Sequence, residues 1–272
     1  MVMNKISIKE RQKFLDEHIS KHKIIDSEII RFLNWNIQNP SLGRAAKQME
    51  WLEKSNFDVI ALTEVKFSQG GAYIRDRLQS LGYNVMFTPE NKSPEVMKYG
   101  VILAVKKFFK EVSNIPISYL QWRIASAICN FSRKDVLVSC VHVPVWKDQR
   151  MKMFLNEIEK FITNENFKKK FDSWILLGDF NLLEPNHIPR HPQYKSWEYF
   201  YNVVKKYEFI DAFRFFHPTE KEYSWFGRKG SGYRFDHIFT SSNILPFLKD
   251  CFYIHEPRLK GFSDHSAMYL EI

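Results

Sequence analysis

The spacing of the predicted strands is the feature that most constrains the fold. Apolar runs over 83–88, 99–105, 123–131 and 135–143 are typical of strands. Several of the segments between them are too short for the helical crossover that joins parallel strands. Elsewhere strands alternate with amphipathic helices, the longest predicted over 148–168. We therefore expect an α/β protein, a four-layer α/β/β/α sandwich of two mixed sheets flanked by helices.

The chain of 272 residues shows no internal repeat and no Gly/Ser linker. We therefore expect residues 30–272 to form a single domain. Residues 1–29 mix charges with isolated apolar side chains, and an amphipathic pattern over 7–22 predicts a helix there. We interpret residues 1–29 as an N-terminal helical extension.

The composition indicates the setting and the kind of partner. A formal charge of +9 favours a polyanionic partner, although many basic proteins bind none. Three cysteines without a C-x-x-C pair indicate a reducing compartment. The sequence shows no signal peptide and no apolar run long enough to span a membrane. We expect a cytoplasmic protein, with no membrane partner and with a monomer as the favoured state.

Polar side chains stand at the ends of most of the apolar runs, where α/β scaffolds place their chemistry. They are Asn36, Glu64, His142, Asp179, Asn181, Asp236, Asp264 and His265. Carboxylate and amide oxygens suit a hard divalent cation, and imidazole suits proton transfer. Each residue alone also has a structural interpretation: Asn36 in a turn, His142 as a hydrogen-bonded strand end, or Asp236 paired with Arg234. Gly178 before Asp179 indicates a close approach of two backbones.

The order of these motifs resembles the endonuclease/exonuclease/phosphatase superfamily, over about residues 30 to 272. The segments that carry the resemblance are Asn34-Trp35-Asn36-Ile37, Leu62-Thr63-Glu64, Val141-His142-Val143-Pro144, Gly178-Asp179-Phe180-Asn181, Arg234-Phe235-Asp236-His237 and Ser263-Asp264-His265. Abasic-site endonucleases of this superfamily carry a tyrosine where this chain has His142. The histidine is more similar to the deoxyribonuclease and phosphodiesterase branches.

The resemblance implies a metal-dependent phosphodiesterase and a role for each residue. Glu64 is the implied principal Mg²⁺ ligand, with Asn36 beside it and Asp264 near the same site or joined through water; Mn²⁺ is an expected substitute. Asp179 would align or deprotonate the attacking water. The remaining implied catalytic roles are phosphate or nucleophile binding by Asn181, phosphate contact or proton transfer by His265, orientation of His265 by Asp236, and phosphate binding or acid catalysis by His142. We expect His237 to be structural, because strand alternation points it away from Asp236.

The segment 223–234 mixes aromatic, basic and glycine residues just before a predicted catalytic strand. Aromatic rings can stack on bases while cations meet phosphates. The predicted nucleic-acid contacts are Trp225, Arg228, Lys229 and Arg234. A flexible loop with a buried Trp225 is the alternative. We expect a phosphodiesterase acting on nucleic acid, most simply DNA. A small or lipid phosphoester substrate, or an inactive binding module, remains the alternative.

Overall fold

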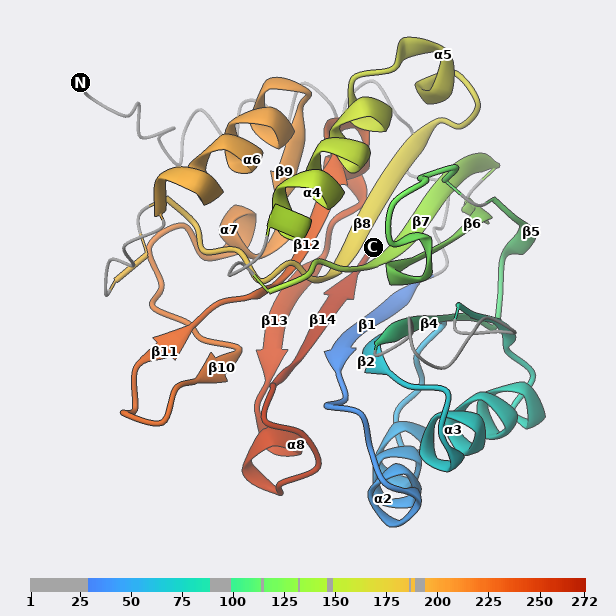
Figure 1. Cartoon of the computed structure of the whole chain (residues 1–272). Helices are drawn as coiled ribbons and strands as arrows, with labels where there is room; N and C mark the ends of the chain where they lie inside the picture. Colours follow the sequence, from blue (N-terminus) through green and yellow to red (C-terminus); the bar gives the residue numbers. More distant parts are fainter. Residues whose placement is uncertain are drawn as a thin grey trace.

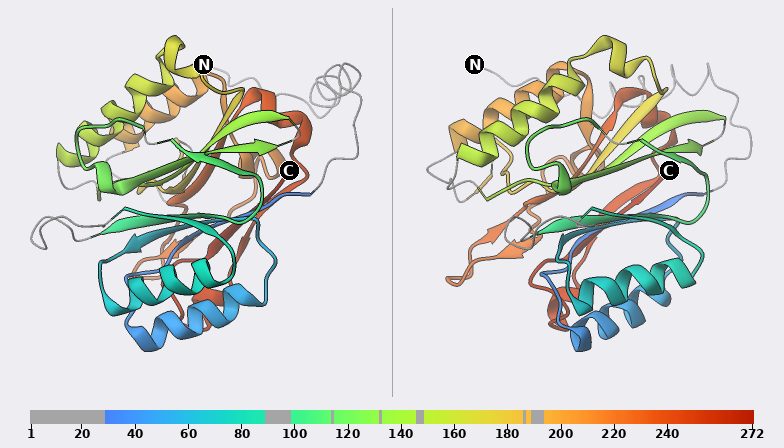
Figure 2. Two further views of the ribbon diagram at one scale, coloured as in Figure 1. Left: turned by 90° about the vertical axis from the view of Figure 1, so that its right-hand side faces the viewer. Right: turned by 45° about the vertical axis from the view of Figure 1, so that its right-hand side comes forward.

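The computed structural model describes residues 29–88, 99–113, 115–131, 133–145, 149–185, 187–188 and 194–272. These residues form two six-stranded sheets packed face to face, with helices on both outer sides (Figures 1 and 2). The predicted α/β/β/α sandwich is confirmed. The helix predicted over 7–22 lies outside the described residues. No helix in the described part of the chain is both long and apolar enough to cross a membrane.

The first sheet joins strands from both ends of the chain. Its strands, in spatial order, are β13 (Asp250–Ile254), β14 (Ala267–Glu271), β1 (Arg31–Asn36), β2 (Val59–Val65), β4 (Gly100–Val105) and β3 (Asn84–Phe87). Within it β1 and β2 run parallel, and the other neighbours are antiparallel. The carboxyl ends of β1 and β2 therefore reach the same edge, which brings Asn36 and Glu64 to one place.

The second sheet is built from the middle of the chain. Its spatial order is β5 (Phe109–Val112), β6 (Ile124–Phe131), β7 (Lys134–His142), β8 (Ser173–Asp179), β12 (Asp236–Ser241) and β9 (Phe209–Asp211). Here β7 and β8 are the parallel pair, and β12 runs antiparallel to β8. The carboxyl ends of β7 and β8 and the start of β12 therefore meet at one edge. A small hairpin of β10 (Trp225–Phe226) and β11 (Gly232–Tyr233) projects beside it (Figure 1).

Apolar side chains form three layers. The central layer lies between the sheets and includes Phe32, Val138 and Met268. The outer face of the first sheet is covered by α2 (Leu42–Glu53) and α3 (Gln69–Ser80), and that of the second by α4 (Gln149–Ile162) and α6 (Tyr194–Lys206) (Figure 2). The short elements are η1 (Gln121–Arg123), α5 (Glu165–Lys168), α7 (Ala212–Phe216), η2 (Ser242–Phe247) and α8 (Glu256–Leu259).

Local capping sets the ends of two elements, one of them shorter than predicted. The helix predicted over 148–168 ends at Ile162. Asn164 then caps α5, and its side chain accepts hydrogen bonds from the backbone N–H groups of Asn166 and Phe167. Strand β9 likewise ends at Asp211, whose carboxylate caps α7 by accepting from the Arg214 backbone N–H. In both places a side-chain acceptor begins a new helix.

Candidate active site

The strand-end side chains converge at one edge of the sandwich, and Asp179 is the residue that joins them. Ligand atoms of Glu64, His142 and Asp179 lie within 4.8 Å of one another, and so do those of Asp179, Asp236 and His265. Asn36 donates from Nδ2 to Asp179 Oδ2 across the two sheets, at 2.8 Å. Both sheets therefore contribute to one polar cluster.

The parallel pairing of β7 and β8 places His142 beside Asp179. The two residues are partners in the register, and Val141 is the partner of Gly178. A Cβ at position 178 would lie 1.8 Å from the Val141 carbonyl oxygen, so only glycine fits there. The close approach predicted from the sequence is therefore what sets the spacing of these two side chains.

Glu64 has an unusual backbone conformation. Its φ is 55°, in the left-handed region, and it lies in an irregularity of the β2–β4 pairing between Leu62 and Val65. Its carbonyl accepts a hydrogen bond from the Asn39 backbone N–H at 2.8 Å. A non-glycine residue held this way costs on the order of 1 kcal/mol or more, and such strain is concentrated at functional sites.

His265 and Asp236 form a buried charged pair. His265 Nδ1 lies 2.8 Å from Asp236 Oδ2, and Asp236 is fully buried. Burial alone would lower the pKa of His265, but the charge of Asp236, its hydrogen bond and the nearby Asp179 raise that pKa to about 10. The imidazole is therefore cationic at neutral pH, with its Nε2–H available to an anionic ligand.

Asp179 is a carboxylate in a crowded acidic environment. Burial and the negative charge of Asp236 raise its pKa to about 7, with a further contribution from Glu64 and an opposing effect of His265. Its oxygens accept hydrogen bonds from Asn36 and from the Asn181 backbone N–H, the latter at 2.9 Å. A divalent cation would relieve this repulsion, and the oxygen-rich donor set with Glu64 fits a hard ion.

His142 is held neutral by its surroundings. Burial lowers its pKa well below the ordinary value, and Arg123 and His265 act in the same direction. Arg123 Nη1 lies 3.2 Å from His142 Nδ1. Because a guanidinium only donates, Nδ1 accepts and the imidazole proton is on Nε2. Arg123 is half-buried against this catalytic candidate, and no sequence motif indicated it.

Asp264 lies apart from the acidic cluster. It is exposed, and its Oδ2 accepts a hydrogen bond from Trp225 Nε1 at 2.9 Å. The Trp225 ring lies 5.8 Å from Tyr233, 5.9 Å from Phe235 and 6.4 Å from His265, between ring centroids. Trp225 thus lies next to the imidazole of His265, and the Tyr233 and Phe235 rings lie next to Trp225. The sequence pattern indicated Trp225 but gave no reason to select Tyr233 or Phe235.

The basic residues of the hairpin region separate into two groups. Arg228 and Lys229 are exposed at the tip between β10 and β11. Arg234 is fully buried, bonded to both Asp211 and Glu184. A nucleic-acid phosphate cannot reach it, so Arg234 is not part of a nucleic-acid contact surface as predicted. Its burial follows from two acidic partners that lie far away in the sequence.

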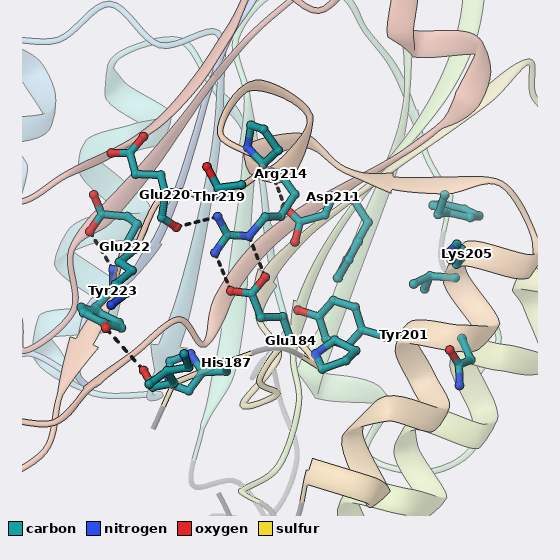
Figure 3. Close-up of a pocket in the computed structure, with 18 residues that line it drawn as sticks. Glu184, His187, Tyr201, Lys205, Asp211, Arg214, Thr219, Glu220, Glu222 and Tyr223 are labelled. Atoms are coloured by element: carbon teal, nitrogen blue, oxygen red, sulfur yellow. Dashed lines mark hydrogen bonds and ion pairs between the residues drawn. The ribbon is translucent and has the colours of Figure 1, made fainter. Parts of the chain in front are cut away.

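The ion pairs around Arg234 border a pocket of about 570 Å³ (Figure 3). In that view the Arg214 guanidinium is bonded to Glu184, and Asp211 accepts a hydrogen bond from the Arg214 backbone N–H. The acidic cluster around Asp179 does not line this pocket. The pocket is therefore separate from the catalytic candidates, and the carboxylates of Glu184 and Asp211 are already paired with arginines.

Residues 33–265 match the model of the Endonuclease/Exonuclease/phosphatase family. The chain belongs to this family. It is therefore a phosphoric ester hydrolase, and the recognition made from the motif order is confirmed. Among curated proteins, none matches the chain significantly.

Solved structures of endonuclease/exonuclease/phosphatase proteins share its fold. A Neisseria 3′ phosphatase bound to product DNA hairpin is 20% identical with a TM-score of 0.70, covering 89% of this chain and 98% of that one. An AP endonuclease from Archaeoglobus fulgidus is 19% identical with a TM-score of 0.68 and the same coverages, 89% and 98%. The AP endonuclease LMAP from Leishmania major is 16% identical with a TM-score of 0.68, covering 92% and 89%.

Proposed function

We propose that this protein is a Mg²⁺-dependent phosphodiesterase acting on nucleic acid, most simply DNA. The observation that carries the proposal is the cluster centred on Asp179, in which carboxylates and a cationic imidazole meet beside the aromatic and basic hairpin. The solved relatives include a phosphatase bound to a DNA hairpin and two AP endonucleases. Those activities belong to these proteins, and they support a nucleic-acid substrate here.

Metal binding is assigned to oxygen-bearing residues in and beside the cluster. Glu64 would be the principal ligand, with Asn36 beside it and Asp264 connected through water. Mg²⁺ typically uses only one or two protein carboxylates and keeps several waters, which fits this sparse set. When bound, the ion would neutralise phosphate charge and help the leaving oxygen depart.

The remaining residues act on the water and the phosphate. Asp179, with a pKa of about 7, can take a proton from the attacking water. The cationic His265 stabilises negative charge on the phosphate oxygens, and Asp236 holds its ring in place. His142 is neutral, so its Nε2–H donates a hydrogen bond to the phosphate. Asn181 is held by its Nδ2 bond to the Val143 carbonyl, at 2.9 Å, at the edge of the same cluster.

The decisive experiment incubates the purified protein with supercoiled plasmid, linear duplex and single-stranded DNA in Mg²⁺ or Mn²⁺. We expect cleavage of at least one of these, loss of activity in EDTA, and a lower rate with a higher metal requirement for Glu64→Ala. Turnover of a small or lipid phosphoester without any DNA cleavage would overturn the nucleic-acid assignment. Full activity of Glu64→Ala would overturn the metal assignment.

The proposed setting is the cytoplasm, with the protein acting as a monomer. All three cysteines are buried and free, which supports a reducing compartment.

A further inference from the structure

Phe67 is an exposed aromatic residue close to the catalytic cluster. Its side chain is 63% exposed, more than that of Tyr199, Phe226 or Phe252. It follows Glu64 by three positions, so the two Cα atoms are at most about 10 Å apart. Nothing in the catalytic mechanism proposed above uses this ring.

The turn that carries Phe67 is held firmly. The Ser68 backbone N–H bonds to the Lys66 carbonyl at 2.9 Å, and the Ser68 hydroxyl caps α3 by accepting from the Gly71 backbone N–H. A Cβ on Gly71 would lie 2.1 Å from the Lys66 oxygen, and one on Gly70 would lie 2.2 Å from the Pro40 oxygen. The two glycines allow α3 to pack directly against neighbouring backbone. Phe67 is therefore presented from a rigid turn at the end of β2, where α3 begins (Figure 1).

The surroundings of Phe67 combine aromatic rings with cations. Its ring stacks on Phe87, with centroids 6.2 Å apart and an interplanar angle of 18°. The Arg75 guanidinium lies over Phe87 at 5.6 Å, and Lys66 Nζ lies over Tyr99 at 5.0 Å. The Tyr99 ring is in turn 6.0 Å from His142. The consecutive residues Lys66 and Phe67 therefore each lie against an aromatic ring, and the ring next to Lys66 lies near His142.

A purely structural role explains this arrangement poorly. Phe67 precedes the cap of α3, where an apolar residue often packs against the fourth helical position. That position is Ala72, which offers only a methyl group. One face of the ring rests on Phe87, and the ring remains mostly open to solvent. Aromatic faces flanked by cations are the surface that proteins use to stack unpaired bases.

We propose that Phe67 stacks on an unpaired nucleobase of the substrate strand, close to the scissile phosphate. Lys66 meets a phosphate of the same strand. The inference rests on the proposed function, and it narrows the substrate to strands with accessible bases: single strands, frayed ends or gaps. Bases inside an intact duplex are stacked on their neighbours and do not offer a free face to the ring.

The test is equilibrium binding of a fluorescein-labelled thymidine oligonucleotide in EDTA, where cleavage is absent. Phe67→Ala weakens binding by about 5- to 150-fold, the value of one base–aromatic stack. On a strand of the same length built from abasic residues, the variant and the wild type bind alike, because there is no base to stack. Phe67→Trp restores binding to the thymidine strand.

Phe252→Ala is the matched control. Phe252, on the edge strand β13, is also an exposed phenylalanine, 37% accessible. Its ring stacks on that of Tyr269 on β14. Phe252→Ala leaves the affinities for the thymidine strand and for the abasic strand unchanged.

Two results would overturn the inference. The first is that Phe67→Ala and the wild type bind the thymidine strand with equal affinity. The second is that Phe67→Ala loses the same affinity for the thymidine strand and the abasic strand. Either result would show that no base stacks on Phe67. In that case cleavage of the oligonucleotide by the wild type in Mg²⁺ would leave the proposed function standing. A wild type that neither binds nor cleaves any strand would reject both proposals.

Discussion

Two buried clusters of charged side chains meet at β12, and they differ in how their charges are balanced. Around Arg234, the carboxylates of Asp211 and Glu184 both have cationic partners. Burial would raise their pKa values, but the neighbouring guanidinium groups lower that of Glu184 to about 2 and that of Asp211 further. Around Asp179 the opposite holds, because burial and neighbouring carboxylates raise its pKa to about 7.

The adjacent residues Asp236 and His237 divide between these clusters. Asp236 bonds to His265 in the catalytic cluster. His237 points to the other face of the strand, where it meets Tyr201 and the Leu182 carbonyl and lies near Asp211. The difference indicates that a charge network whose charges are all paired supports the fold, whereas one with surplus negative charge is prepared for a cation.

The largest expected effect is on catalysis. His265→Ala removes the group that we propose contacts the phosphate or transfers a proton, so kcat should fall by about 10²–10⁴-fold. Initial rates of DNA cleavage in saturating Mg²⁺ measure this, with circular dichroism to verify that the variant is folded. A folded variant that retains more than a tenth of the wild-type rate would remove His265 from the catalytic cluster.

The next effect is on stability. Arg234→Ala leaves Asp211 and Glu184 buried beside an empty space, and the free energy of unfolding should fall by about 3–5 kcal/mol. Urea denaturation followed by fluorescence measures the change. Arg77→Ala, which breaks a surface ion pair with Glu53, is the control and should cost at most about 1 kcal/mol. Equal losses in the two variants would contradict a special role for the buried network.

A pH series sharpens the same contrast. The pKa of Glu184 is lower in the folded protein than its ordinary value of 4.5, so its stabilising contribution is present above pH 4.5 and is lost as pH falls toward 2. That contribution is on the order of 3 kcal/mol at neutral pH. Glu184→Gln should therefore flatten the decline in unfolding free energy between pH 4.5 and 2. If the variant loses unfolding free energy between pH 4.5 and 2 as steeply as the wild type, Glu184 is not the group that causes the loss.

The smallest effect concerns His237. His237→Gln should cost about 1–2 kcal/mol of stability through altered buried hydrogen bonds. The rate of cleavage should fall by less than tenfold, below the range for loss of an acid–base group. Comparing this variant with His265→Ala in the same two assays distinguishes the structural role of His237 from the catalytic role proposed for His265. A catalytic loss as large as that of His265→Ala would show that His237 also acts in catalysis, contrary to the structural role assigned to it.

The sequence predicted the layers and the strand-end positions well, because both depend on local patterns. Apolar runs and their spacing determine the mixed sheets, and polar residues that follow parallel strands must meet at one edge. The close backbone approach at Gly178 was also predicted from the sequence, because glycine lacks the side chain that would prevent it. His237 was assigned a structural role from strand alternation alone, and its contacts agree with that assignment.

The contacts that the sequence did not reveal are those between distant segments. Nothing near Arg234 in the sequence indicates that Asp211 and Glu184 enclose it. The bond between Trp225 and Asp264 joins positions 39 residues apart. The left-handed backbone of Glu64 depends on how β2 pairs with β4, which no residue pattern indicates.

The first sheet takes strands from both ends of the chain, while the second is built between them. A single proteolytic nick between β4 and β13 would therefore not release one sheet from the other. One fragment would carry Glu64 and the other His265, and the two would remain paired through β1 and β14. Neither fragment alone holds a full catalytic set, so recovered activity on mixing them would be a direct reporter of their reassembly.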